Sequence, residues 1–154
     1  MDELSRRAEP NVDELTDIVI ADDDRPARDD LVALYASVGW TAYTRAPELL
    51  ETAIAGSLRV VTARRDGALV GLARAVGDGA TIAYVQDILV VPALQRSGVG
   101  RRLVTALLEP WPHVRQKVLI TDAEPQQRAF YESLGFREIR DLDAGGLRAF
   151  VRFD

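Results

Sequence analysis

The chain contains no cysteine and a single histidine, His113, among its 154 residues. The lack of cysteine excludes disulfides, thiolate nucleophiles and cysteine-ligated zinc, and it fits a reducing, intracellular setting. One histidine, surrounded by proline and polar residues, offers a histidine triad or a metal centre almost no ligands. We therefore expect no metal site.

Long apolar runs and an excess of positive charge are also lacking. No stretch approaches the roughly 20 apolar residues of a membrane-spanning helix, and the charged, acidic N-terminus does not resemble a signal peptide. The net charge of −5 argues against nucleic acid as the main partner, because phosphate binding needs a basic surface. We therefore expect a cytoplasmic protein without a nucleic-acid or membrane partner.

The composition that remains is typical of a globular protein, with 47% hydrophobic and 28% charged residues. The length is sufficient for one domain with a core of its own. Residues 1–14 are polar and show no period, so we interpret them as a flexible N-terminal tail that precedes a single domain over 15–154.

The apolar periodicity predicts strands and helices in the order β-α-α-β-β-β-α-β-α-β-β. The expected strands cover 17–22, 58–65, 68–76, 81–91, 117–121, 136–142 and 147–154. The expected helices cover about 26–38, 47–55, 99–109 and 125–134. This order predicts an α+β fold, a mixed and mostly antiparallel sheet with helices on both faces. The strand at 117–121 is apolar enough to be buried on both faces, and the last two strands form a closing hairpin.

A glycine-containing loop, QRSGVG at 95–100, follows an apolar strand and precedes a helix. It lacks the Lys-Ser or Lys-Thr of a Walker A loop, and Leu103 stands where a dinucleotide fingerprint needs its third glycine. It matches the remaining design, Q/R-x-x-G-x-G/A, in which backbone N–H groups and a helix N-terminus surround an anion. The pattern favours a diphosphate site. Arg101 and Arg102 fit a bound polyanion, or they are solvated surface residues.

Two stretches then resemble the motifs of the GNAT acetyltransferase superfamily: YVQDILVVPALQRSGVGRRLVTALL at 84–108 and VLITDAEPQQRAFYESLGF at 118–136. The resemblance extends over 17–154. It implies an N-acetyltransferase that uses acetyl-CoA as donor and a primary amine of a small molecule or peptide as acceptor, by direct attack. The alternative is a non-catalytic module of the same fold that binds or senses acyl-CoA.

The resemblance also implies a site for the donor. The pantetheine arm is expected on the backbone of the strand before the loop, where one N–H serves the thioester carbonyl, although the same side chains can belong to the core. The diphosphate is expected on the amides of the loop. A family asparagine that reaches the pantetheine arm is replaced by Glu124, and Gln127 can take its place. The implied donor-binding residues are Leu89, Val90, Val91, Gln95, Arg96, Ser97, Gly98, Val99, Gly100, Arg101 and Gln127.

Two residues match the catalytic positions of the family. Tyr131 corresponds to the frequent general acid, which protonates the departing CoA thiolate, or else it is a packing residue of its helix. Asp87, in the pair Gln86-Asp87, orients the acceptor amine or relays its proton through water. Its alternative is a carboxylate tied to the backbone at a strand bulge.

The acceptor region is implied by Trp40 and Tyr43, which follow the first helix. Aromatic rings suit an amine-bearing or aromatic acceptor through cation–π or stacking contacts. The two rings can equally pack between helices. The identity of the acceptor is not encoded in any motif, and a homodimer through the last strands or the sheet edge is compatible with this fold.

Overall fold

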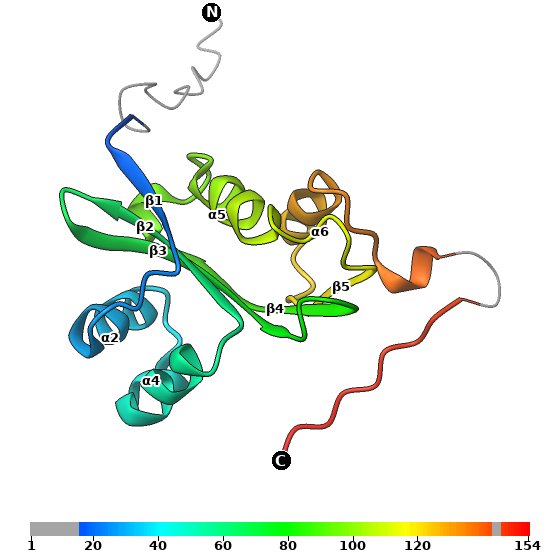
Figure 1. The fold of residues 1–154 in the computed structure, drawn as a ribbon, viewed down its shortest axis with the longest axis horizontal. Coiled ribbons are helices and arrows are strands. Elements are labelled where there is room, and N and C mark those ends of the chain that lie inside the picture. The colour runs from blue at the N-terminus through cyan, green and yellow to red at the C-terminus, as the bar shows by residue number, and fades with distance from the viewer. Residues whose placement is uncertain (1–15, 143–145) are drawn as a thin grey trace, which may run out of the picture. The chain divides into compact units, whose positions relative to one another are not determined.

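The computed structural model describes residues 16–142 and 146–154 (Figure 1). The chain divides into two compact units, one that ends at Leu119 and one over Ile120–Asp154, and each is described by itself. The expected N-terminal tail at 1–14 lies outside the described residues. The single-domain organisation over 15–154 stays a prediction.

The first unit is built on one five-stranded sheet whose strands lie in chain order. The first four strands pair antiparallel, and the fifth is parallel to the fourth. This arrangement confirms the predicted mixed, mostly antiparallel sheet. The strands are β1 (Ile18–Asp22), β2 (Arg59–Arg65), β3 (Ala68–Gly77), β4 (Ile82–Val90) and β5 (Gln116–Leu119).

Helices of the first unit lie on both faces of this sheet, as predicted (Figure 1). They are α2 (Arg28–Ser37), α3 (Thr41–Thr44), α4 (Pro47–Ala55) and α5 (Val99–Leu108). Successive side chains of a strand point to opposite faces. In β2, accordingly, Val60 packs with α2 and α4, while Val61 packs with α5. The single-turn helix α3 was not predicted. No helix among the described residues is long and apolar enough to cross a membrane.

A β-bulge interrupts the pairing of β3 with β4. Arg74 lies opposite Asp87, and the next residue, Ala75, lies opposite Val85, so Gln86 is an extra residue in β4. An extra residue in one strand shifts the alternation of side chains between the two faces. The shift occurs within the pair Gln86-Asp87.

The core clusters show the effect of this bulge. Val85, before the bulge, and Val90, after it, both pack on the side of α5, although they are an odd number of residues apart. Leu89 packs on the other side, with α2 and α4. The bulge therefore allows the adjacent residues Gln86 and Asp87 to line one and the same pocket.

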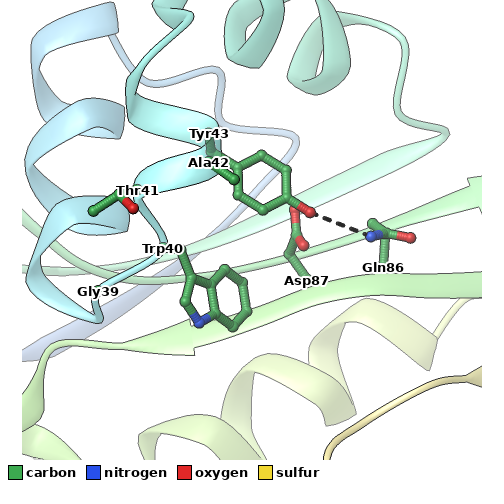
Figure 2. A pocket seen from close by; sticks show the side chains of 7 residues that line it. All are labelled: Gly39, Trp40, Thr41, Ala42, Tyr43, Gln86 and Asp87. Carbon is green, nitrogen blue, oxygen red and sulfur yellow. Dashed lines mark hydrogen bonds between the residues drawn. The ribbon is translucent and has the colours of Figure 1, made fainter. Parts of the chain in front are cut away.

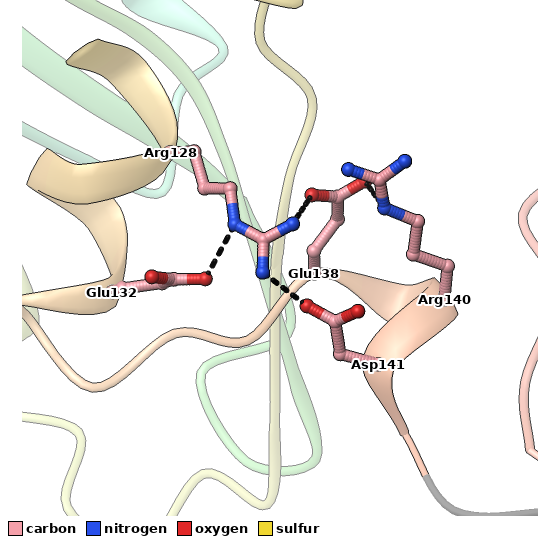
Figure 3. A network of polar contacts seen from close by, with 5 residues as sticks. All are labelled: Arg128, Glu132, Glu138, Arg140 and Asp141. Atoms are coloured by element: carbon pink, nitrogen blue, oxygen red, sulfur yellow. Dashed lines mark hydrogen bonds and ion pairs between the residues drawn. The ribbon is translucent and has the colours of Figure 1, made fainter. Parts of the chain in front are cut away.

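The second unit contains α6 (Pro125–Glu132) and a short 3₁₀ helix, η2 (Ile139–Asp141). Arg128 of α6 connects the two (Figure 3). Its guanidinium contacts Glu132 at 2.8 Å, Glu138 at 2.8 Å and Asp141 at 2.5 Å. Three carboxylates around one arginine keep η2 next to α6 and raise the pKa of Arg128 through their negative charge, that of Asp141 foremost.

The predicted closing hairpin is wrong for the residues that the structure describes. Part of 136–142 forms η2, and 147–154 contains no strand. Part of the expected turn, residues 143–145, lies outside the described residues. A strand needs a neighbour for its N–H and C=O groups, and the described residues of the second unit form none.

The prediction that 117–121 is buried on both faces is also wrong. β5 covers Gln116–Leu119, and its side chains are half-buried or exposed. The reason is its position, because β5 lies at the end of the sheet and, among the described residues, has β4 as its one strand neighbour. Apolar composition alone does not distinguish a central strand from such an edge strand.

Candidate active site

The second half of β4 has an open edge. β5 pairs with β4 over Ile82–Val85 and not beyond. Among the described residues, the stretch Gln86–Val90 therefore has a strand partner, β3, on one side only. Unpaired backbone groups at such an edge are available to an extended ligand, which can bind as an added strand does.

Hydrogen bonds at the end of β4 identify the amide that faces this edge. The N–H of Val91 donates to the carbonyl of Val70 in β3 at 2.9 Å. Because the direction of N–H groups alternates along a strand, that of Leu89 also points toward β3, whereas that of Val90 points to the open edge. The carbonyl of Val90 lies on the same edge, where it accepts a hydrogen bond from Gln95 Nε2 at 3.1 Å.

The glycine loop begins directly after this strand. A 3₁₀ turn, η1 (Pro92–Leu94), leads into it, and α5 begins at Val99. Arg96 and Gly98 have positive φ angles of 65° and 97°. Left-handed residues that alternate with ordinary ones turn successive N–H groups toward one point, as in anion-binding nests. The first turn of α5 has neither a side-chain cap nor an acidic residue, so its positive end is not neutralised there.

Side chains in and directly after the loop donate hydrogen bonds to backbone carbonyls of the protein. The Ser97 hydroxyl donates to the carbonyl of Leu94 at 2.5 Å, and Arg102 Nη2 donates to the carbonyl of Ile18 in β1 at 2.9 Å. Gln95, as described, is bound to Val90. These contacts fix the shape of the loop.

Gly98 gives a direct test of this loop. An L-residue at its φ of 97° costs about 1–2 kcal/mol of left-handed strain. In Gly98→Ala the loop relaxes and binding must restore its shape, so we expect the affinity for acetyl-CoA to fall about tenfold by calorimetry. Gly67→Ala is the matched control, because Gly67 has a φ of 81°, equally open surroundings and a place in the β2–β3 turn. Equal affinity in both variants would contradict the assignment.

A pocket opens at the same strand segment, on the face of the sheet that α2 and α4 cover (Figure 2). It has a volume of about 410 Å³. Its walls come from the segment that connects α2 with α3, from α3 itself and from the bulge of β4. The lining residues are Gly39, Trp40, Thr41, Ala42, Tyr43, Gln86 and Asp87. The structure thus brings Asp87 together with Trp40 and Tyr43, although Asp87 follows these two residues by more than 40 positions in the sequence.

The aromatic wall is a cluster of three rings. Tyr35 of α2 lies with its ring centroid 5.9 Å from that of Trp40 and 5.3 Å from that of Tyr43, and the last two are 6.1 Å apart. The Tyr43 hydroxyl also accepts a long hydrogen bond of 3.5 Å from Gln86 Nε2 (Figure 2). Trp40 and Tyr43 therefore pack with a helix residue and line the pocket at the same time.

Asp87 is buried at the floor of the pocket and is held by two side chains. Its Oδ2 atom accepts hydrogen bonds from the Tyr35 hydroxyl at 2.8 Å and from Arg74 Nε at 2.5 Å. Arg74 is buried as well, and its Nη1 atom reaches the hydroxyl of Ser57 at 3.4 Å. Burial and the adjacent carboxylate raise the pKa of Tyr35 far above its ordinary value, so its hydroxyl remains a donor.

Sequence reasoning missed the roles of Tyr35 and Arg74. Tyr35 has the helical spacing of a core residue, and nothing in that spacing reveals a carboxylate 52 positions away. The sequence does contain an indication for Arg74, because it is the one charged residue within the strand ALVGLARAVG. A charge on a strand that is otherwise apolar indicates a buried partner of opposite sign.

The remaining predicted site residues lie in the second unit. Tyr131 is half-buried in α6, where its ring makes edge contacts with Phe130 and Phe136. Burial raises the pKa of its hydroxyl, and the charge of Asp122 adds to this, while a hydrogen bond with Thr121 opposes it. Gln127 is half-buried in the first turn of the same helix. Its position next to the donor stays a prediction.

Known proteins share this architecture. The family model described as "Acetyltransferase (GNAT) domain" matches residues 35–145. A GNAT family acetyltransferase of Streptococcus pneumoniae TIGR4 superimposes with a TM-score of 0.75 at 34% identity, over 88% of this chain and 99% of that one. The aminoglycoside N-acetyltransferase AAC(6')-Iy, solved in complex with CoA, has the same fold, with a TM-score of 0.61 at 19% identity over 89% of this chain and 94% of that one.

Curated sequences agree with the structural comparison. An uncharacterized N-acetyltransferase, ycf52, of Pyropia yezoensis is 30% identical over 74% of this chain and 66% of its own length. The chain spans 42–66% of the length of most curated relatives that it matches. The chain therefore belongs to the GNAT acetyltransferase family. The resemblance noted in its two motifs is thereby confirmed.

Proposed function

We propose that the chain transfers an acetyl group from acetyl-CoA to a primary amine of a small molecule or peptide by direct attack. The observation that carries this proposal is the second half of β4. One edge of this stretch is open next to the glycine loop, and its bulge forms the floor of an aromatic and acidic pocket. Donor and acceptor can thus meet along one strand segment.

The donor half of the proposal is supported by backbone geometry. The pantetheine arm takes the open edge of β4, and the diphosphate takes the amides of residues 96–101, with Arg101 near them. The thioester carbonyl accepts a hydrogen bond from the N–H of Val90, which faces the open edge. One such donor to a developing oxyanion contributes about 2.7–4 kcal/mol in comparable enzymes.

The acceptor half is supported by the pocket. A primary amine that carries an apolar or aromatic group fits between Trp40 and Tyr43, and its nitrogen lies near Asp87. This residue is three positions before Val90, a separation of about 10 Å along an extended strand. This separation leaves room for the acceptor nitrogen next to Asp87 and for the thioester carbon next to Val90, so that the nitrogen can attack the carbon.

The reaction itself needs a nucleophile without a proton and a leaving group with one. The neutral amine attacks the thioester carbon, the tetrahedral intermediate collapses, and the carbon–sulfur bond breaks. Tyr131 then donates its phenolic proton to the CoA thiolate, and the amine loses its extra proton to water through Asp87 or directly.

Two measurements on the wild-type protein test the proposal. Acetyl-CoA at a hundredfold excess over its Kd stabilises the protein by about 2.7 kcal/mol, which appears as a higher Tm. A panel of primary amines, alkyl and aromatic, is then screened for release of free thiol. Thiol release that depends on one class of amine supports the proposal. A shift in Tm without thiol release from any amine favours an acyl-CoA-binding or sensing module instead, and no shift contradicts both.

A further inference from the structure

Asp87, which lines the floor of the acceptor pocket, forms an ion pair with Arg74 behind it, and the pair has no net charge. Asp87 and Arg74 contact each other at 2.5 Å, and their side chains are only 1% and 7% exposed. Both bonds that reach Asp87 end on Oδ2, one from Arg74 and one from Tyr35. No hydrogen bond from the described residues to Oδ1 is present.

On the basis of the proposed function, we propose that Arg74 and Tyr35 are positioning residues for the acceptor. They hold one oxygen of Asp87 and cancel its charge, so that the other oxygen accepts a hydrogen bond from a neutral amine. Neither residue touches the reacting atoms. Each acts through the carboxylate.

The physical reason is the protonation state of the acceptor. An isolated carboxylate at this place would stabilise the ammonium form of the amine, which has no lone pair with which to attack. A carboxylate already paired with a guanidinium attracts a cation far less, yet it retains a lone pair with which to orient an N–H group. The ion pair therefore orients the acceptor amine without stabilising its charged ammonium form.

The groups that surround Asp87 come from several elements. β3 contributes Arg74, α2 contributes Tyr35, and α3 contributes the phenol of Tyr43. The neighbour on β4 itself, Gln86, is uncharged. Tyr35 stays protonated at all accessible pH values because burial and the carboxylate raise its pKa. The charge at the pocket floor is thus set by Arg74 against Asp87.

Two substitutions of opposite charge test the proposal through the pH profile of kcat. The profile is measured with saturating acetyl-CoA and the best amine of the screen, and its acidic limb reports deprotonation of the bound amine. In Arg74→Met the floor becomes negative, and the limb moves to higher pH by about one pH unit or more. In Asp87→Asn the floor becomes positive, and the limb of the residual activity moves to lower pH by a similar amount.

Three further variants control the comparison. The double variant Arg74→Met/Asp87→Asn has no charge at the floor, and its limb returns to the wild-type position. Arg74→Lys keeps the charge, so its limb stays in place. Tyr35→Phe removes only the hydroxyl, and we expect a lower kcat with an unmoved limb and an unchanged KM for acetyl-CoA.

The outcomes separate this inference from the proposed function. If the limbs of Arg74→Met and Asp87→Asn overlay that of the wild type, while the proteins are folded, the pair has only a structural role and the inference is overturned. If only one of these two variants folds, an unmoved limb in that variant is sufficient to overturn the inference. If the wild-type protein releases no thiol with any amine, the proposed function itself fails, before any variant is compared.

Discussion

Replacement of Tyr131 by Phe lowers the turnover number by about two to four orders of magnitude, the usual contribution of a general acid. The phenolic proton is lost, and the CoA thiolate must leave unprotonated or take a proton from water. The ring remains, so the contacts of Tyr131 with Phe130 and Phe136 persist. The affinity for acetyl-CoA is therefore expected to change little.

The measurement is steady-state thiol release together with calorimetric titration of acetyl-CoA. Tyr84→Phe is the matched control, because it removes the same atom from a tyrosine of β4 with no proposed role. Burial raises the pKa of Tyr131, so its proton is present throughout the neutral range and the wild-type rate does not fall until the solution is strongly alkaline. Full turnover in Tyr131→Phe would show that another group is the acid.

The second large effect concerns stability. Removal of one partner from a buried ion pair typically costs about 3–5 kcal/mol, because the other charge stays buried without compensation. We expect this loss in the free energy of unfolding for Arg74→Met, since Arg74 and Asp87 are both almost fully buried. The double variant Arg74→Met/Asp87→Asn leaves no such charge, and most of the loss should be recovered.

Urea unfolding of the wild type, the single variant and the double variant measures this coupling directly. Arg28→Met is the control for an exposed pair, since Arg28 contacts Glu51 in solvent, and it should leave the unfolding midpoint nearly unchanged. A double variant that is less stable than Arg74→Met would contradict the expected origin of the loss. In that case packing of the long arginine side chain, rather than its charge, would be the main contribution.

Much of the fold could be predicted because it is encoded locally. The apolar periodicity predicted the adjacent strands at 58–65 and 68–76, and the structure confirms them as β2 and β3. The same periodicity predicted the helix at 99–109, which the structure confirms as α5. The predictions fail where the neighbouring elements determine the outcome. They fail at 147–154, which has no strand partner among the described residues of its unit, and at β5, which lies at an edge of the sheet.

The candidate site shows the same division. The glycine loop consists of six consecutive residues, so its pattern alone predicts an anion site next to a helix N-terminus. The acceptor pocket joins residues 39–43 with 86 and 87, and no spacing rule connects them. The resemblance to the family predicted Trp40, Tyr43 and Asp87, whereas Arg74 and Tyr35 were not predicted because their partner is distant in the sequence.

By itself, the sequence determined the family and, apart from the single-turn helix α3, the order of the main strands and helices of the first unit, and it predicted an anion site at the loop. These properties depend on side-chain period and on glycine at particular positions, which are local. The tertiary structure alone decided that the amide of Val90 faces an open edge and that Asp87 is neutralised by Arg74. A bulge, an unpaired edge and a buried ion pair are relations between strands, and they exist only once the sheet has formed.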